Sequence, residues 1–117
     1  MKALLVNGSP HKGGCTHTAL GIVGGALREC GVEADEFWIG NKPIAGCIGC
    51  YQCAGRGSCV FEGDKVEEFL GIVGGYDAFV FGSPVYYSGM AGSMKCFMDR
   101  VFFSNQGRVT FALKPAA

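Results

Sequence analysis

The fold is decided by the opening stretch Lys2-Ala3-Leu4-Leu5-Val6-Asn7-Gly8-Ser9-Pro10-His11-Lys12-Gly13-Gly14-Cys15-Thr16. Residues 2–7 are a short apolar run that a turn signal of Asn, Gly, Ser and Pro ends, which predicts a buried strand. Residues 16–30 then predict a helix, and Gly31 is its stop signal. The chain therefore begins with a strand, a glycine-rich turn and a helix. The apolar positions of that helix are Leu20, Val23, Leu27 and Cys30.

Two further strand–helix pairs follow along the chain. Residues 32–39 and 78–81 predict strands, and residues 64–74 and 90–103 predict helices with one apolar face each. Strands that alternate with helices are joined by right-handed crossovers, so we expect an α/β fold with an open parallel sheet. The segment 40–63 between the second strand and the second helix is irregular.

Length and composition limit the function classes. The chain has 117 residues, of which 49% are hydrophobic and 17% charged, with a formal net charge of zero. This composition excludes a disordered chain and gives no basic patch for nucleic acid. The apolar start is too short for a signal peptide, and no segment approaches the length of a membrane span. We expect a cytoplasmic protein that binds neither nucleic acid nor membranes.

The cysteines are the strongest chemical signal. Seven cysteines without a secretion signal indicate thiol or metal chemistry. Four of them follow the pattern C-x2-C-x2-C-x5-C in a glycine-rich stretch: Cys47, Cys50, Cys53 and Cys59. Such spacing can bring four sulfurs onto one small object, as iron–sulfur clusters require. Structural zinc, free thiols and a reversible disulfide are alternatives, although zinc sites usually pair two cysteine knuckles across a longer gap.

Two loops follow strands at the edge where open α/β sheets bind ligands. In the first, the hydroxyls of Ser9, Thr16 and Thr18, the charge of Lys12 and the amides of a helix start suit a phosphate. The loop lacks both the Walker and the G-x-G-x-x-G patterns. The alternative is an ordinary helix cap at Cys15 or Thr16.

The second loop, residues 82–90, carries two adjacent tyrosines beside glycines. Tyr86 and Tyr87 could stack on a flat ring, or they could be ordinary half-buried loop aromatics. Together, the two loops could bind one ligand, the first loop its phosphate and the second loop its planar ring.

These motifs together resemble a known family. Residues 7–16 resemble the FMN phosphate loop of the NAD(P)H-dependent FMN reductase and flavodoxin-like family. Residues 83–90, with Lys95-Cys96-Phe97-Met98-Asp99-Arg100 after them, resemble the isoalloxazine loop and the following helix of that family. The cysteine run is similar to the compact motif of the iron–sulfur flavoprotein branch. The resemblance covers nearly the whole chain.

The resemblance implies a flavodoxin-like open parallel sheet with helices on both faces, in one FMN-binding domain, residues 1–117. The family sheet has five strands, so we expect this chain to be truncated after the third strand–helix unit, as an N-terminal fragment. An oligomer could cover the open edge. Members form dimers or higher oligomers that bring the cluster of one subunit near the flavin of another.

The resemblance also implies the site residues. The phosphate of FMN would be lined by Ser9, Lys12, Cys15, Thr16 and Thr18. The flavin ring would contact Pro84, Val85, Tyr86, Tyr87, Ser88 and Gly89. A 4Fe–4S cluster would be bound by Cys47, Cys50, Cys53 and Cys59. No catalytic acid or base is needed, and none is named.

The predicted function is that of an FMN-dependent oxidoreductase or electron-transfer protein, similar to NADPH-dependent FMN reductases, in which the cluster relays electrons to or from FMN. Expected electron donors are NAD(P)H or ferredoxin, and the expected assembly is a homodimer or higher homo-oligomer. The alternatives are a cluster-free NAD(P)H-dependent flavin or quinone reductase, a non-catalytic flavodoxin-like carrier, and a metal-binding regulatory module.

Residues outside these motifs are expected to be structural. Cys30 and Cys96 are predicted to lie in the core, and Cys15 is expected to act as a small packing residue. Asp99 and Arg100 are predicted to form an exposed or interface charge pair.

Overall fold

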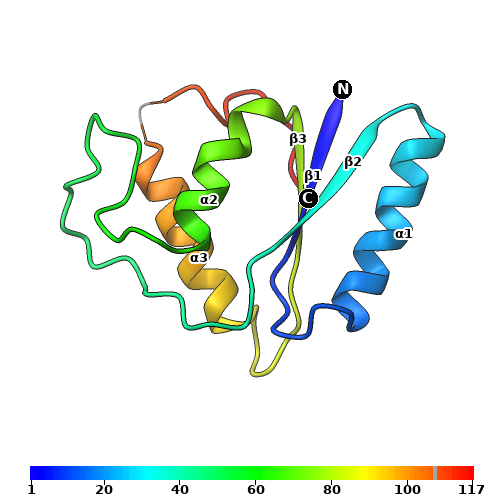
Figure 1. Cartoon of the computed structure of the whole chain (residues 1–117), viewed down its shortest axis with the longest axis horizontal. Helices are drawn as coiled ribbons and strands as arrows, with labels where there is room; N and C mark the ends of the chain where they lie inside the picture. The colour runs from blue at the N-terminus through cyan, green and yellow to red at the C-terminus, as the bar shows by residue number, and fades with distance from the viewer. Residues whose placement is uncertain (107) are drawn as a thin grey trace.

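The computed structural model describes residues 1–106 and 108–117 (Figure 1). Three parallel strands, β1 (Lys2–Asn7), β2 (Glu33–Trp38) and β3 (Ala78–Gly82), form a sheet in the order β2-β1-β3. The first strand of the chain is therefore central, and its residues pair with both neighbours. The predicted open parallel sheet is confirmed.

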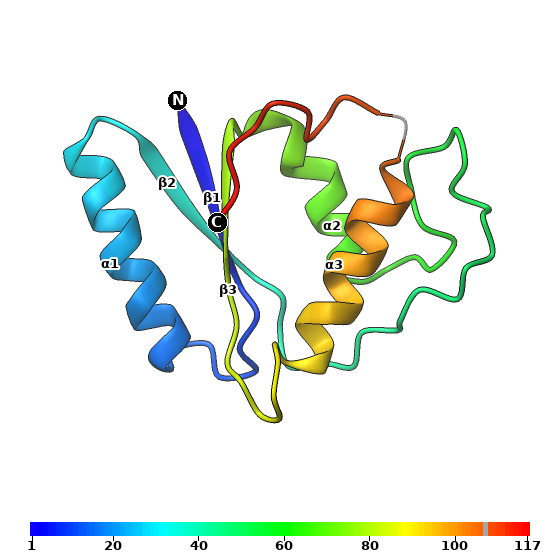
Figure 2. The ribbon, with the colours of Figure 1, turned by 180° about the vertical axis from the view of Figure 1, so that it is seen from behind.

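Helices cover both faces of this sheet (Figures 1 and 2). The helix α1 (Cys15–Glu29) lies on one face, whereas α2 (Lys65–Ile72) and α3 (Gly92–Ser104) lie on the other. A short 3-10 turn, η1 (Val73–Gly75), follows α2. All three predicted helices are present, with ends within two residues of the predicted ones.

The main core lies between the sheet and the pair α2–α3. Its centre is a cluster of phenylalanine rings, in which Phe69 lies 5.4 Å from Phe37 and 5.1 Å from Phe97 between ring centroids. Phe69 and Phe97 are fully buried. Aromatic residues that pack edge to face contribute large apolar areas and fix their mutual orientation, so α3 is held firmly on the sheet.

The face under α1 is thinner. Leu20 packs against Leu5 and Ala34, and Gly24 is buried. A Cβ at Gly24 would lie 2.9 Å from a methyl carbon of Leu5. The glycine therefore allows α1 to approach the sheet closely. Val23 is 39% exposed and Cys30 is exposed at the end of the helix, so the prediction that Cys30 lies in the core is wrong.

The end of the chain lies along the outer edge of β3. The Phe79 amide donates to the Pro115 carbonyl at 3.0 Å, and the Ala117 amide donates back to the Phe79 carbonyl at 3.1 Å. This parallel pairing occupies the position that a strand next to β3 would take (Figure 2). Of the helices in the described residues, none has both the length and the apolar character to cross a membrane.

Candidate functional site

The loop between β1 and α1 is shaped by a buried asparagine. Asn7 is fully buried at the end of β1, and its Oδ1 accepts a hydrogen bond from the Ser9 amide at 3.0 Å. Its Nδ2 donates to Glu36 Oε1 at 2.8 Å. The hydroxyl oxygen of Ser9 then accepts from the His11 amide at 3.1 Å. Buried polar groups with satisfied hydrogen bonds specify one path for the backbone.

The end of β2 supports the same loop. Trp38 Nε1 donates to the Ser9 carbonyl at 2.7 Å, and its ring lies 5.5 Å from Lys12 Nζ. Glu36 also contacts His17 Nδ1 on α1, at 2.7 Å. Sequence reasoning missed Asn7, Glu36 and Trp38 as supports. The available signal was that β2 runs beside β1, so the residues at the two strand ends must meet.

The first turn of α1 is open at its N-terminus. Gly14 is the N-cap residue and has no side chain with which to cap the first-turn amides. Thr18 Oγ1 donates to the Gly14 carbonyl at 3.4 Å, which leaves the hydroxyl oxygen able to accept a bond. Uncapped amides at a helix start suit an anion. Among the predicted phosphate residues, Ser9 is buried and Thr16 half-buried, whereas Lys12, Cys15 and Thr18 are exposed around this turn.

The second predicted loop lies beside the first. The Gly8 amide donates to the Gly82 carbonyl at 2.8 Å, so the ends of β1 and β3 are joined directly. A Cβ at Gly8 would lie 2.7 Å from Met94 Sδ and 3.0 Å from the Gly82 carbonyl oxygen. A side chain at Gly8 would require Met94 or the Gly82 carbonyl to shift, so glycine favours this close approach. Both loops therefore lie at the same end of the sheet (Figure 1).

The loop after β3 presents its tyrosines to solvent. Its base is closed by the Ala91 amide, which donates to the Pro84 carbonyl and to Ser83 Oγ at 3.0 Å each. Tyr86 is 64% and Tyr87 91% exposed, so these two rings are not ordinary half-buried loop aromatics. The remaining predicted ring-contact residues, Val85, Ser88 and Gly89, are also exposed, and Pro84 is half-buried. The loop can therefore offer two aromatic faces to a planar ligand.

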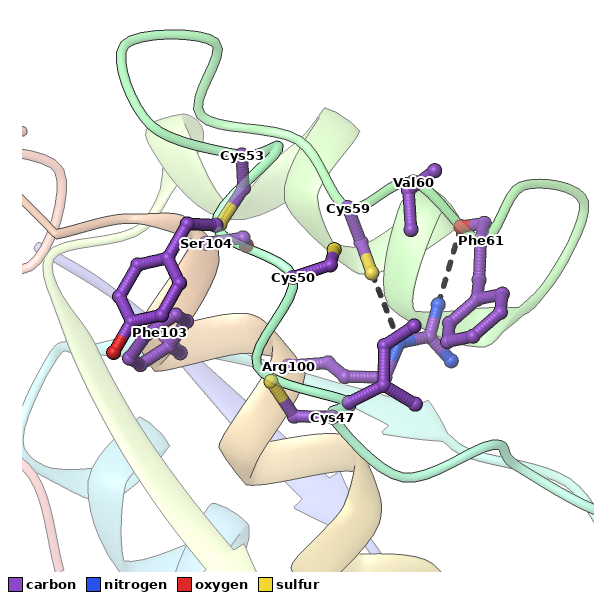
Figure 3. A pocket seen from close by; sticks show the side chains of 11 residues that line it. Cys47, Cys50, Cys53, Cys59, Val60, Phe61, Arg100, Phe103 and Ser104 are labelled. Carbon is purple, nitrogen blue, oxygen red and sulfur yellow. Dashed lines mark hydrogen bonds between the residues drawn. The ribbon is translucent and has the colours of Figure 1, made fainter.

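The cysteine loop, Gly40–Gly63, contains no helix or strand. All four predicted ligands, Cys47, Cys50, Cys53 and Cys59, line one hollow of about 330 Å³, a volume that includes space open to solvent (Figure 3). The far wall of the hollow is formed by residues of α3, among them Arg100, Phe103 and Ser104. The structure thus gathers all four thiols around one space.

The four thiols suit more than one kind of metal centre. Within residues 1–106 and 108–117, no three His, Cys, Asp or Glu side chains converge closely enough for one metal ion. A zinc ion needs all its sulfur ligands at about 2.3 Å, whereas a cluster is held by thiolates on separate iron atoms. Four thiols on one hollow form a donor set of the kind that holds an iron–sulfur cluster or a structural zinc ion.

Arg100 lies beneath this hollow (Figure 3). It is 1% exposed, and its Nε donates to Cys59 Sγ at 3.3 Å. Its terminal nitrogens donate to the Phe61 carbonyl at 3.1 Å and to the Ala45 carbonyl at 3.3 Å, and one of them pairs with Asp64. Burial alone would lower the pKa of Arg100, but the hydrogen bonds to Asp64 and Cys59 raise it above its usual value.

The predicted exposed charge pair of Asp99 and Arg100 is therefore wrong for Arg100. Adjacent residues of a helix point about 100° apart, so Asp99 stays outside and pairs with Lys95 one turn earlier. Arg100 points inward, where the cysteine loop covers it. Of the other cysteines, Cys96 is half-buried, whereas Cys15 is exposed and does not act as a packing residue.

A sequence model of the NADPH-dependent FMN reductase family matches residues 1–117. The chain belongs to that family. It is 37% identical over 101 residues to an iron-sulfur flavoprotein of Archaeoglobus fulgidus, covering 86% of this chain and 46% of that protein. An iron-sulfur flavoprotein of Methanocaldococcus jannaschii is 33% identical over 114 residues, covering 97% of this chain and 57% of the relative. The chain thus spans about half the length of these relatives.

Other comparisons agree. An iron-sulfur flavoprotein of Clostridioides difficile is 35% identical over 98 residues, covering 82% of this chain and 44% of that protein. The crystal structure of Smu.1420 from Streptococcus mutans UA159 shares the fold, with a TM-score of 0.63 and 22% identity, over 87% of this chain and 53% of that one. These matches confirm the prediction that the chain belongs to the iron–sulfur flavoprotein branch of the FMN reductase family. They also confirm the predicted flavodoxin-like fold.

Proposed function

We propose that this chain is the cofactor-binding part of an FMN-dependent oxidoreductase in which a 4Fe–4S cluster relays electrons to or from FMN. The observation that carries the proposal is the coexistence of two ligand-binding features in one chain of the FMN reductase family. Two hydrogen-bonded loops meet at one end of the sheet, and four cysteines line one hollow beside α3.

FMN would lie across the two loops. The uncapped first turn of α1 would bind its phosphate, together with Ser9, Lys12, Cys15, Thr16 and Thr18. The exposed loop after β3 would hold the ring through Pro84, Val85, Tyr86, Tyr87, Ser88 and Gly89. Asn7 and Trp38 would keep the phosphate loop in place, because both hydrogen-bond the backbone of Ser9.

The cluster would be held by Cys47, Cys50, Cys53 and Cys59. When bound, FMN supplies electron transfer in steps of one or two electrons and the cluster supplies single-electron transfer. The chain's own residues bind and orient these groups, and no protein acid or base is assigned. Phe103 and Ser104 would shield one side of the cysteine hollow from water.

The helix α3 separates the two proposed sites. The loop after β3, which is the proposed flavin loop, ends just before Ala91, the N-cap residue of α3. Arg100 and Ser104, in the C-terminal half of α3, line the cysteine hollow. At 1.5 Å per residue these positions are about 14–20 Å apart along the helix axis. We propose that a homodimer or higher homo-oligomer brings the cysteine loop of one chain near the flavin loop of another. NAD(P)H or a ferredoxin would donate electrons.

Anaerobic purification followed by iron, zinc and flavin analysis tests the proposal. We expect about four irons and one FMN per chain, with visible absorption that bleaches on reduction by dithionite. Addition of NADPH should bleach the flavin. FMN without iron would favour a cluster-free reductase or, without NADPH oxidation, an electron carrier. Zinc without FMN would favour a regulatory module and overturn the proposal.

A further inference from the structure

We infer that Arg100 is the positioning residue of the cysteine loop. Its side chain ties the two ends of the cysteine run together and places a positively charged hydrogen-bond donor against the cluster. The inference rests on the proposed function, because it concerns the four cysteines as cluster ligands. It adds a role for a side chain that is itself no ligand.

Arg100 contacts carbonyls on both sides of the four cysteines. Ala45 precedes the first ligand, Cys47, and Phe61 follows the last ligand, Cys59. The same guanidinium donates to both carbonyls, at 3.3 Å and 3.1 Å. Closing a flexible loop costs conformational entropy, and a rigid clamp at its ends offsets that cost. Arg100 therefore holds the two ends of the cysteine run together before any metal binds.

Arg100 also contacts the sulfur of one proposed ligand directly. Among the described residues, Cys59 is the one cysteine of the four whose sulfur accepts a hydrogen bond from a cationic side chain. Net charge and hydrogen bonds to the sulfurs help to set the reduction potential of a cluster. The N–H group that Arg100 directs at Cys59 Sγ stabilises the more negative, reduced form, even though Asp64 pairs with another nitrogen of the same guanidinium. Arg100 should therefore raise the potential of the bound cluster.

Arg100 is itself held in place by Asp64 and Phe61. Asp64 caps α2, since its Oδ1 accepts from the Val66 and Glu67 amides at 3.0 Å and 3.4 Å. Its other oxygen pairs with Arg100, and the ring of Phe61 lies 5.2 Å from the guanidinium carbon. Such outer partners orient the groups that contact a metal centre. Because the planar fork of Arg donates in several directions at once, lysine cannot replace it.

Three variants of the whole chain test the inference. Arg100→Met removes the charge and all the hydrogen bonds, whereas Arg100→Lys keeps the charge but loses the fork. Arg108→Met is the matched control, because Arg108 also donates to this loop, at the Arg56 carbonyl on its exposed side, and not to a ligand sulfur. Each variant is reconstituted with iron and sulfide without oxygen, and its iron content and reduction potential are measured.

We expect lower iron content in both Arg100 variants, and a more negative potential for the cluster that Arg100→Met retains. Arg100→Lys should have a cluster reduction potential close to that of the wild type, because the charge is kept. Its iron content should fall further from the wild-type value, because the contacts to the two carbonyls are lost. Arg108→Met should match the wild type in both. Hydrogen exchange of metal-free protein should be faster across residues 45–61 in the Arg100 variants. If Arg100→Met does not fold, Arg100→Lys and its exchange rates still decide the matter.

Two failures are distinguishable. A wild-type chain that binds no iron overturns the proposed function itself. A wild-type chain with a cluster, whose iron content, potential and loop exchange are all unchanged by Arg100→Lys and Arg100→Met, overturns the role of Arg100 alone.

Discussion

The phosphate loop, residues 8–14, and the cysteine loop, Gly40–Gly63, differ in how the protein holds them. The phosphate loop is short and is fixed by the buried Asn7, by Trp38 and by the backbone bond between Gly8 and Gly82. The cysteine loop is long and lacks regular structure. Its main anchors are Arg100 and an edge-to-face contact between Tyr51 and Phe103, with ring centroids 5.5 Å apart.

The two loops should therefore depend to different degrees on a bound ligand for their order. Ordering a residue costs about 1–2 kcal/mol of conformational entropy, and the phosphate loop offsets that cost with hydrogen bonds from both strand ends. The cysteine loop makes fewer hydrogen bonds to the rest of the protein for its length. We therefore expect the phosphate loop to keep its shape without FMN, and the cysteine loop to gain order when metal binds.

The largest effect should come from the cysteines. Replacing Cys50 by Ser removes one of the four thiols on the hollow, so the iron content should fall to a small fraction of the wild-type value. The measurement is iron per chain after anaerobic reconstitution. Cys30→Ser is the matched control, because Cys30 is exposed at the end of α1, the helix on the other face of the sheet. Equal iron in the two variants would contradict the cluster assignment.

A smaller effect is expected for the phosphate loop. Gly8→Ala forces a Cβ against Met94 and the Gly82 carbonyl, and such overpacking costs about 1–3 kcal/mol of unfolding free energy. It should also weaken FMN binding, because it separates the two loops. Gly13→Ala provides the control, since a Cβ there has no neighbour within 4 Å. Chemical denaturation and FMN titration check both variants; equal stabilities would show that the loops do not need this contact.

A substitution in the loop after β3 should change the affinity for FMN without changing the stability of the fold. Tyr87 is 91% exposed, so Tyr87→Ala should change the unfolding free energy by less than about 0.5 kcal/mol. If its ring stacks on FMN, the loss of that contact should weaken binding by about 0.5–1.5 kcal/mol. Quenching of flavin fluorescence measures the affinity. An unchanged affinity would remove Tyr87 from the predicted site.

The smallest effect on stability is expected for Asp35 on β2, which lies away from both loops. Hydrogen bonds from Lys2 and Tyr76 lower the pKa of Asp35 below its usual value. The stabilisation is therefore present above the ordinary carboxyl pKa and is lost as the pH falls through the lowered pKa. Asp35→Asn should flatten the acid side of a stability–pH curve slightly. A curve identical to wild type would show that solvent cancels this contact.

Much of this architecture could be predicted from local patterns. The apolar runs at 2–7 and 78–81 and the glycine-rich turn before α1 predicted the strands and the position of the phosphate loop. Periodicity failed at Cys30 and Val23, because Gly24 lets α1 approach the sheet on a different face. It also failed at Arg100, since a charged residue is ordinarily placed outside and its partners are far away in sequence.

The alternation of strands and helices and the places of the two loops after β1 and β3 follow from the sequence alone, because they depend on local propensity and on residues close together in the chain. The tertiary structure alone decided that Asn7, Glu36 and Trp38 support one loop and that Arg100 lies beneath Cys59. Those contacts join residues far apart in sequence, and a polar side chain is buried only where the fold provides partners for it.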